Sequence, residues 1–119
     1  MITFIDSHAH LNDEAFNNDR DQIISACFNA GVKQMVEIAC EVPEWQQAFN
    51  LCQKYKGQIY AAAAIHPINA EQLTDNSFEE LQKFLSYDNF KAVGEIGLDY
   101  FYEDSSPRAL QQEVFERQL

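Results

Sequence analysis

The chain has 119 residues, of which 46% are hydrophobic, and its 8 basic and 19 acidic residues give a net charge of −11 at pH 7. The basic residues are scattered along the sequence, which excludes a basic track for binding long duplex DNA. No window approaches about eighteen apolar residues, and no basic stretch followed by a long apolar run opens the chain, so we expect neither membrane insertion nor secretion.

Apolar runs typical of strands alternate with helical patterns along the whole chain. A strand is indicated by a short run of apolar and β-branched residues, and a helix by apolar residues three and four positions apart. Strands are expected over 1–5, 33–40, 59–65 and 90–96, and helices over 19–30, 43–57, 77–85 and 109–119. The sequence therefore predicts four strand-then-helix units.

Individual residues support the helix boundaries. Gly31 follows the first helical pattern and is a natural stop, while Pro43 suits the first turn of the second helix. Ser77, with Glu80 three residues later, is predicted to cap the third helix. The last helix is expected to keep Leu110, Val114 and Phe115 in helical register.

The alternation of strands and helices predicts an α/β fold with parallel strands, because a tight hairpin cannot join two parallel strands. A doubly wound sheet and a TIM barrel both fit this pattern. A doubly wound nucleotide-binding sheet would carry a glycine-rich loop after its first strand, but residues 7–11 occupy that place and include no glycine. This favours the barrel.

A complete TIM barrel takes about 250 residues, so residues 1–119 are expected to form one domain, the amino-terminal half of a barrel with four βα units. Four parallel strands without closure would leave an apolar inner face and two strand edges uncovered. We therefore expect the isolated chain to self-associate through the open half-barrel, by pairing of two copies or by aggregation.

Two histidines lie one residue apart at the end of the first predicted strand. On a strand His8 and His10 would share a face, and imidazole is a common ligand of divalent cations. The alternative is a polar strand end with two unrelated histidines. Their surroundings favour a metal site, because the carboxyl ends of barrel strands are where catalytic residues gather.

Glu95 and His66 also follow predicted strands. Glu95 interrupts an apolar run between Gly94 and Gly97, and a divalent cation shared with the two histidines would compensate a carboxylate buried there. The alternative is a carboxylate facing water. His66 precedes a proline, which sets it on an extended loop aimed at the same end, where it contacts substrate or is simply a loop histidine.

Three motifs together resemble the TatD family of metal-dependent hydrolases. They are Asp6-Ser7-His8-Ala9-His10-Leu11, Ile65-His66-Pro67 and Gly94-Glu95-Ile96-Gly97-Leu98-Asp99-Tyr100, and the similarity continues through residues 112–119. The resemblance implies a TIM-barrel hydrolase of the amidohydrolase superfamily that cleaves DNA phosphodiester bonds. It implies one or two divalent metal ions as cofactors, with Mg, Mn and Zn all open.

The resemblance also implies roles for individual residues. His8 and His10 match the metal ligands of the first strand, Glu95 matches the carboxylate ligand of the fourth strand, and His66 matches a residue at the substrate edge. Glu95 and His66 are accordingly the candidate catalytic residues. The family takes two more histidines and an aspartate from later strands, so this chain is expected to be a truncated form, and no general base can be assigned within it.

The expected function is a metal-dependent deoxyribonuclease that uses a metal-activated water, acting as an exonuclease on single-stranded DNA ends. An acidic body is compatible with an enzyme that engages only a few nucleotides. One alternative is a binuclear amidohydrolase that cleaves a small amide, lactone or phosphoester, since fold and ligands do not choose the substrate. Another is a half-barrel module without catalytic activity.

Five residues near these motifs leave alternatives open. Asp6 would orient a ligand imidazole or cap a turn. Asp99 would orient groups around Glu95 or likewise cap a turn. The aromatic run of Tyr100, Phe101 and Tyr102 would stack unpaired bases or, as such runs more often do, pack at the barrel rim.

Three cysteines, Cys27, Cys40 and Cys52, form no Cys-x-x-Cys pair and are expected to be reduced thiols, which favours a cytoplasmic location. Cys40 alone falls at the carboxyl end of a predicted strand. With no candidate base beside it in sequence, we do not expect it to act as a nucleophile.

Overall fold

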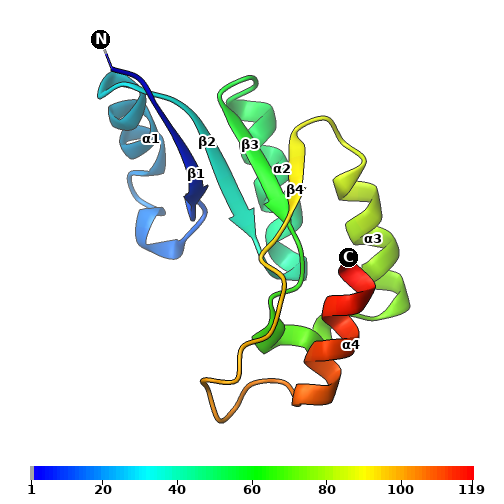
Figure 1. Ribbon diagram of the computed structural model, residues 1–119. Helices are drawn as coiled ribbons and strands as arrows, with labels where there is room; N and C mark the ends of the chain where they lie inside the picture. Colours follow the sequence, from blue (N-terminus) through cyan, green and yellow to red (C-terminus); the bar gives the residue numbers. More distant parts are fainter. Residues whose placement is uncertain (1) are drawn as a thin grey trace.

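The computed structural model describes residues 2–119, which form a four-stranded parallel sheet with strand order β1-β2-β3-β4 (Figure 1). The elements are β1 (Phe4–Ala9), η1 (Glu14–Phe16), α1 (Arg20–Asn29), β2 (Val32–Ala39), α2 (Val42–Lys54), β3 (Ile59–Ala63), η2 (Pro67–Gln72), α3 (Asp75–Leu85), β4 (Phe90–Val93) and α4 (Arg108–Gln118). Consecutive strands are neighbours throughout. The predicted α/β half-barrel of four βα units is confirmed.

The main core lies between the sheet and the helices α1, α2 and α3. Trp45 of α2 is fully buried there, and its indole Nε1 donates a hydrogen bond to the Ala64 carbonyl at 3.0 Å. A second, small cluster of Ile38, Cys40 and Ala62 is separate from this core. The helical side of the sheet therefore carries most of the buried apolar surface, which is the main stabilising contribution.

Helix α4 contacts η2 and lies beyond the carboxyl end of β3 (Figure 1). Its buried residues are Gln111, Val114 and Gln118, while Leu110 and Phe115 are partly buried, and Leu110 packs against the main core. The predicted helical register is confirmed, but the apolar pattern did not predict that the two glutamines are buried. The glutamines are buried because their amides bind loop backbone.

Several element boundaries differ from those expected: β3 ends at Ala63 and β4 at Val93 instead of at 65 and 96, and α2 ends at Lys54 instead of at 57. Strand β1 runs on to Ala9, since parallel pairing with β2 continues until Ala9 lies opposite Glu37, and the predicted start at Met1 lies outside the described residues. Helix α3 begins at Asp75, so the predicted cap at Ser77 was wrong. Thr74 is the N-cap, and the Ser77 hydroxyl accepts the Thr74 N–H in a reciprocal capping box.

Large apolar residues are exposed on both edge strands of the sheet, as expected for an unclosed half-barrel. Ile5 of β1 is 65% exposed and Val93 of β4 is 42% exposed. Across residues 2–119, the helices are all too short or too polar to cross a membrane.

Candidate metal centre

Both histidines of the first motif point toward the space beyond the carboxyl ends of the strands. His8 lies within β1 and His10 immediately follows it, and their rings meet edge to face with centroids 5.1 Å apart. Ala9, between them, packs toward the helical core. The predicted common direction of the two imidazoles is confirmed.

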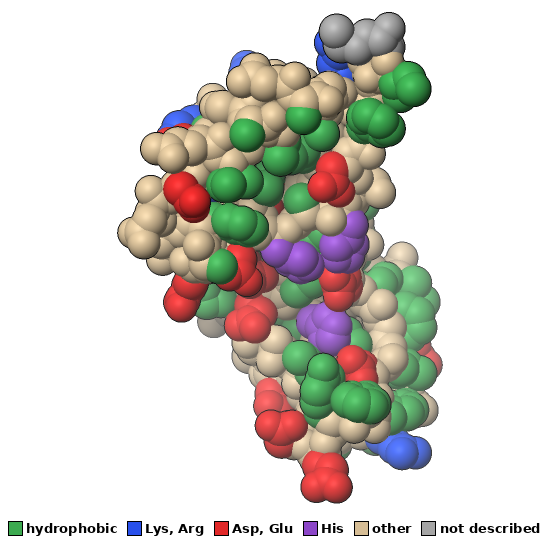
Figure 2. Space-filling model, turned by 90° about the vertical axis from the view of Figure 1, so that its left-hand side faces the viewer, with side chains coloured by type: hydrophobic (Ala, Val, Ile, Leu, Met, Phe, Trp, Pro, Cys, Tyr) green, Lys and Arg blue, Asp and Glu red, His purple; other side chains and the backbone are tan. Residues whose placement is uncertain are grey.

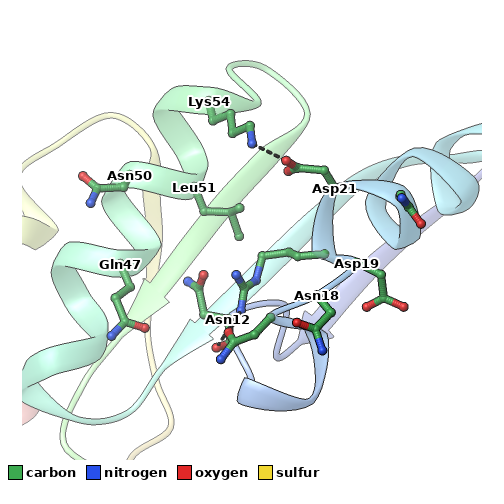
Figure 3. Close-up of a pocket in the computed structure, with 11 residues that line it drawn as sticks. Asn12, Asn18, Asp19, Asp21, Gln47, Asn50, Leu51 and Lys54 are labelled. Carbon is green, nitrogen blue, oxygen red and sulfur yellow. Dashed lines mark hydrogen bonds and ion pairs between the residues drawn. The ribbon is translucent and has the colours of Figure 1, made fainter.

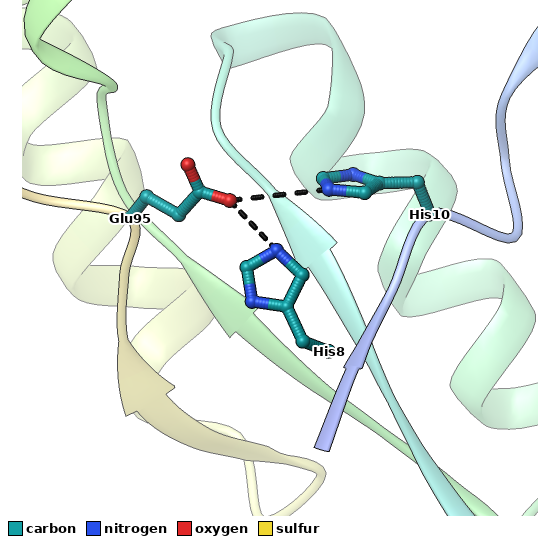
Figure 4. Close-up of side chains that lie close together, drawn as sticks. All are labelled: His8, His10 and Glu95. Carbon is teal, nitrogen blue, oxygen red and sulfur yellow. Dashed lines mark ion pairs between the residues drawn. The ribbon is translucent and has the colours of Figure 1, made fainter. Parts of the chain in front are cut away.

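Glu95 follows β4 at the opposite edge of the sheet, yet its carboxylate reaches both histidines (Figure 4). Its Oε1 lies 2.8 Å from Nε2 of His8 and 3.9 Å from Nε2 of His10. Neighbouring strands are about 4.8 Å apart, so the ends of a flat four-stranded sheet could not meet this way. The curvature of the half-barrel therefore assembles the cluster.

The three side chains offer ligand atoms that all lie within 4.8 Å of one another. Two imidazole nitrogens and one carboxylate oxygen form a donor set that suits a first-row divalent cation, with positions left for water or substrate. The histidines are half exposed and the glutamate is about one-third exposed. The residues thus fit the metal that the motif predicts.

Cys40, at the end of β2, holds the backbone of Glu95, whose N–H donates to its Sγ at 3.3 Å. Burial raises the pKa of the Cys40 thiol to about 11, and the neighbouring carboxylates act in the same direction. The sulfur is therefore a protonated thiol at neutral pH. This agrees with the expectation that Cys40 is not a nucleophile.

His66 lies on the other side of the Glu95 carboxylate, with its Nε2 at 3.3 Å from Oε2. Its Nδ1 accepts a hydrogen bond from the Ile68 N–H at 3.2 Å, so Nδ1 carries no proton. In the neutral ring the proton is then on Nε2, which points into the site. His66 is arranged to donate a hydrogen bond there, unlike a metal ligand, which presents a lone pair.

The two aspartates with open roles bind backbone rather than imidazole. Asp6 Oδ1 accepts from the His8 N–H at 3.1 Å, and Asp99 Oδ1 accepts from the Phe101 N–H at 3.1 Å. The second of these contacts is an Asx turn in the loop that follows Glu95. For Asp99 the turn-capping alternative is thus the one observed.

Three buried polar residues near the site were missed by the sequence analysis. Glu37 on β2 accepts the backbone N–H groups of Leu11 and Asn12, directly after the histidine motif. Gln118 exchanges two hydrogen bonds with the backbone of Ile65, next to His66. Gln111 does the same for Asp99 and also donates to Ser106.

Of these three residues, only Glu37 gave a sequence signal, which was its position. Glu37 interrupts the apolar run of the second strand as Glu95 interrupts that of the fourth, and the same argument would have found it. The glutamines gave no signal, because polar residues on a terminal helix are usually exposed.

The aromatic run after Glu95 is exposed in this chain. Phe101 is 84% exposed and Tyr102 is 53% exposed, and they contact each other edge to face. The Arg108 guanidinium lies 4.4 Å from the ring centroid of Tyr100. Tyr100 therefore packs against Arg108, whereas the rings of Phe101 and Tyr102 are exposed in the loop after Glu95.

A cavity lies on the helical side, between α1 and α2 (Figure 3). Its lining is polar, and its Lys54 and Asp21 pair with each other. Figure 2 shows instead that the histidine side chains gather on the open side among acidic side chains, with basic side chains at the margins. The convergent titratable groups are therefore those of the metal-ligand cluster.

A family model described as TatD related DNase matches residues 5–119. The chain belongs to the TatD family. Among curated TatD-family relatives, it is 32% identical over 114 residues to an uncharacterized metal-dependent hydrolase, YabD, of Bacillus subtilis. It is 33% identical over 115 residues to a 3′-5′ ssDNA/RNA exonuclease, TatD, of Edwardsiella piscicida.

These alignments cover 96% and 97% of this chain but 44% of each TatD-family relative. The crystal structure of the TatD homologue YjjV from Escherichia coli superposes with a TM-score of 0.85 at 33% identity, covering 97% of this chain and 44% of that one. The chain thus spans about 44% of the length of these relatives, and the resemblance to the TatD family is confirmed.

Proposed function

We propose that residues 1–119 form the amino-terminal part of a metal-dependent hydrolase that removes nucleotides from the ends of single-stranded DNA. In this proposal His8, His10 and Glu95 bind a divalent cation, and His66 contacts the substrate. The observation that carries the proposal is the convergence of two imidazoles and a carboxylate from opposite edges of the sheet.

The chemistry follows from the donor set. A bound divalent cation would polarise a phosphoryl oxygen and lower the pKa of a water molecule, and both effects favour hydrolysis of a phosphodiester. The His66 Nε2–H points into the same space and is suited to donate a hydrogen bond to a phosphate oxygen. The proposal includes no general base among residues 2–119.

The surroundings favour a short, single-stranded substrate. The chain carries a net charge of −11, which opposes a long polyanion, whereas contact confined to a strand end needs few phosphate contacts. The exposed rings of Phe101 and Tyr102 offer faces on which unpaired bases can stack. The relative from Edwardsiella piscicida is named as a 3′-5′ ssDNA/RNA exonuclease, so we assign the 3′ end as the site of attack.

The metal centre is tested by titrating the metal-free chain with Mn²⁺ and with Zn²⁺. We expect binding by the unaltered chain and its loss in His8→Ala, His10→Ala and Glu95→Gln. Glu103→Gln is the control, because this exposed carboxylate lies in the loop after Glu95 but outside the cluster. Unchanged metal content in all three site variants would refute the proposal and favour a module without catalytic activity.

The substrate is tested with single-stranded and duplex oligonucleotides labelled at one end, in the presence of Mg²⁺ or Mn²⁺. We expect stepwise shortening of the single strand from its 3′ end and no shortening in His10→Ala. Hydrolysis of cyclic amides or lactones without any attack on DNA would replace the nuclease by the small-molecule hydrolase. The cytoplasmic location stays a prediction.

A further inference from the structure

Side chains bind both the backbone N–H groups and the backbone carbonyl groups of the segment Leu11–Asp13, which directly follows His10. On one side the Glu37 carboxylate accepts the Leu11 N–H at 2.6 Å through Oε2 and the Asn12 N–H at 3.1 Å through Oε1. The two oxygens are thus each occupied by one backbone donor. When the carboxyl group is ionised, these are hydrogen bonds to a charged acceptor, which are among the stronger ones in proteins.

On the other side, Arg20 of α1 binds the carbonyl oxygens of the same segment. Its Nε donates to the Leu11 carbonyl at 2.7 Å, and its Nη2 lies 3.2 Å from the Asp13 carbonyl and 3.4 Å from that of Asn12. The side chain of Asn17 fixes the guanidinium by accepting from Nη2 at 2.7 Å. Asn12 itself lies at the edge of the cavity between α1 and α2 (Figure 3).

Burial of the Glu37 side chain lowers the free energy of unfolding, so its contacts indicate a role other than stabilising the fold. Its side chain is 2% exposed, and in residues 2–119 it forms no salt bridge with a basic residue. A buried carboxylate without a counter-charge destabilises a protein compared with an apolar residue of the same size. Its partners are backbone groups of a single segment, the one that follows the histidine motif.

We propose that Glu37 and Arg20 are positioning residues of the metal centre. Their hydrogen bonds hold the segment Leu11–Asp13 in place and thereby fix His10 against His8 and Glu95. The inference rests on the proposed metal centre. Strand pairing holds the chain as far as Ala9, opposite Glu37, and ends there. Beyond that point the backbone of His10 is held by the hydrogen bond from the Asp13 N–H to its carbonyl, and the segment that makes this bond is held by Glu37 and Arg20.

The test compares four variants of the whole chain by Zn²⁺ affinity, with folding of each checked by circular dichroism. Glu37→Gln keeps the shape but presents an NH₂ group to one of the two backbone donors, and Arg20→Gln removes the guanidinium. We expect each to weaken Zn²⁺ binding about 10–100-fold, the range found for groups that orient metal ligands. Arg20→Lys, which can still bind a carbonyl, should recover part of the loss.

Asp21→Asn is the matched control, because Asp21 also accepts two hydrogen bonds and lies next to Arg20 on α1, but its partners are Lys54 and Tyr55. It should leave the Zn²⁺ affinity unchanged. Folded Glu37→Gln and Arg20→Gln proteins that bind Zn²⁺ as tightly as the unaltered chain would overturn the inference.

A measurement on the metal-free protein separates this inference from the proposed function. The backbone ¹⁵N order parameter of His10 should be that of a rigid segment, about 0.85, and should fall toward 0.6 in Glu37→Gln. If the unaltered chain binds no Zn²⁺, the proposed metal centre is wrong. The order parameter then still decides whether the hydrogen bonds of Glu37 and Arg20 fix His10. An unchanged value in Glu37→Gln would overturn the positioning role by itself.

Discussion

The side of the sheet that faces α1, α2 and α3 differs from the opposite side in what its residues contact. Toward the helices the residues are buried in one continuous core around Trp45, Ile24 and Met35. On the open side a small cluster around Ile38 is flanked by exposed edge strands. Most of the buried apolar residues therefore lie on the side toward the helices, whereas His8, His10 and Glu95 come together on the open side, where few apolar residues are buried.

The first prediction concerns the open side, where the largest change is expected. We expect the chain to self-associate, since exposed apolar residues and two unpaired strand edges favour contact with a second copy. Association should increase with NaCl concentration, because salt screens the repulsion between chains of charge −11. Light scattering after size-exclusion chromatography measures the mass directly.

Substitutions on the two sides of the sheet test whether the open side is the surface that contacts the second copy. Ile5→Lys at the edge strand β1 should reduce association, whereas Ile23→Lys on α1 should leave it unchanged. A monodisperse monomer at all salt concentrations would contradict the prediction and show that the open side does not bind a second copy.

The second prediction concerns the helical side. Trp45→Ala should lower the free energy of unfolding by about 3–5 kcal/mol, the range for removal of a large buried aromatic residue. Trp45 is completely buried and also loses its hydrogen bond to Ala64. Because Trp45 is the single tryptophan, unfolding by urea is followed by circular dichroism. Phe101→Ala, at a residue 84% exposed, is the control and should change stability little.

The third prediction concerns Glu37, which lies at the end of the helical core nearest the metal-ligand cluster. Burial raises its pKa from 4.5 to about 7, against the hydrogen bonds from Leu11 and Asn12, and Glu44 of α2 adds to the rise. The folded state therefore holds the Glu37 proton more tightly than the unfolded state. The stability that this confers is complete below pH 4.5 and is lost as the pH rises through 7.

The expected size is about 3 kcal/mol, since each unit of pKa corresponds to about 1.4 kcal/mol. In urea titrations of the metal-free chain between pH 4.5 and 8, Glu37→Gln should lack this decline. Cys52 also lies near Glu37, but burial raises the pKa of its thiol to about 12, so it does not titrate in this range. Parallel curves for the two proteins would contradict the assignment of Glu37 as the titrating group.

The sequence by itself determined the order of the elements, the parallel α/β class and the residues of the ligand cluster. These depend on local periodicity and on motifs within single segments, as in the pair His8 and His10 or the carboxylate of Glu95 between two glycines. It also indicated that the sheet would be open. The physical reason is that strand and helix patterns repeat within a few residues and need no knowledge of distant contacts.

Only the tertiary structure decided which distant groups meet. The carboxylate of Glu95 reaches His8 across the curved sheet, and Glu37 receives backbone donors from a segment 25 residues away. The burial of Gln111 and Gln118 on α4 likewise depends on the loops that they bind. Burial and hydrogen bonding of a polar side chain depend on its surroundings in space, which no local pattern encodes.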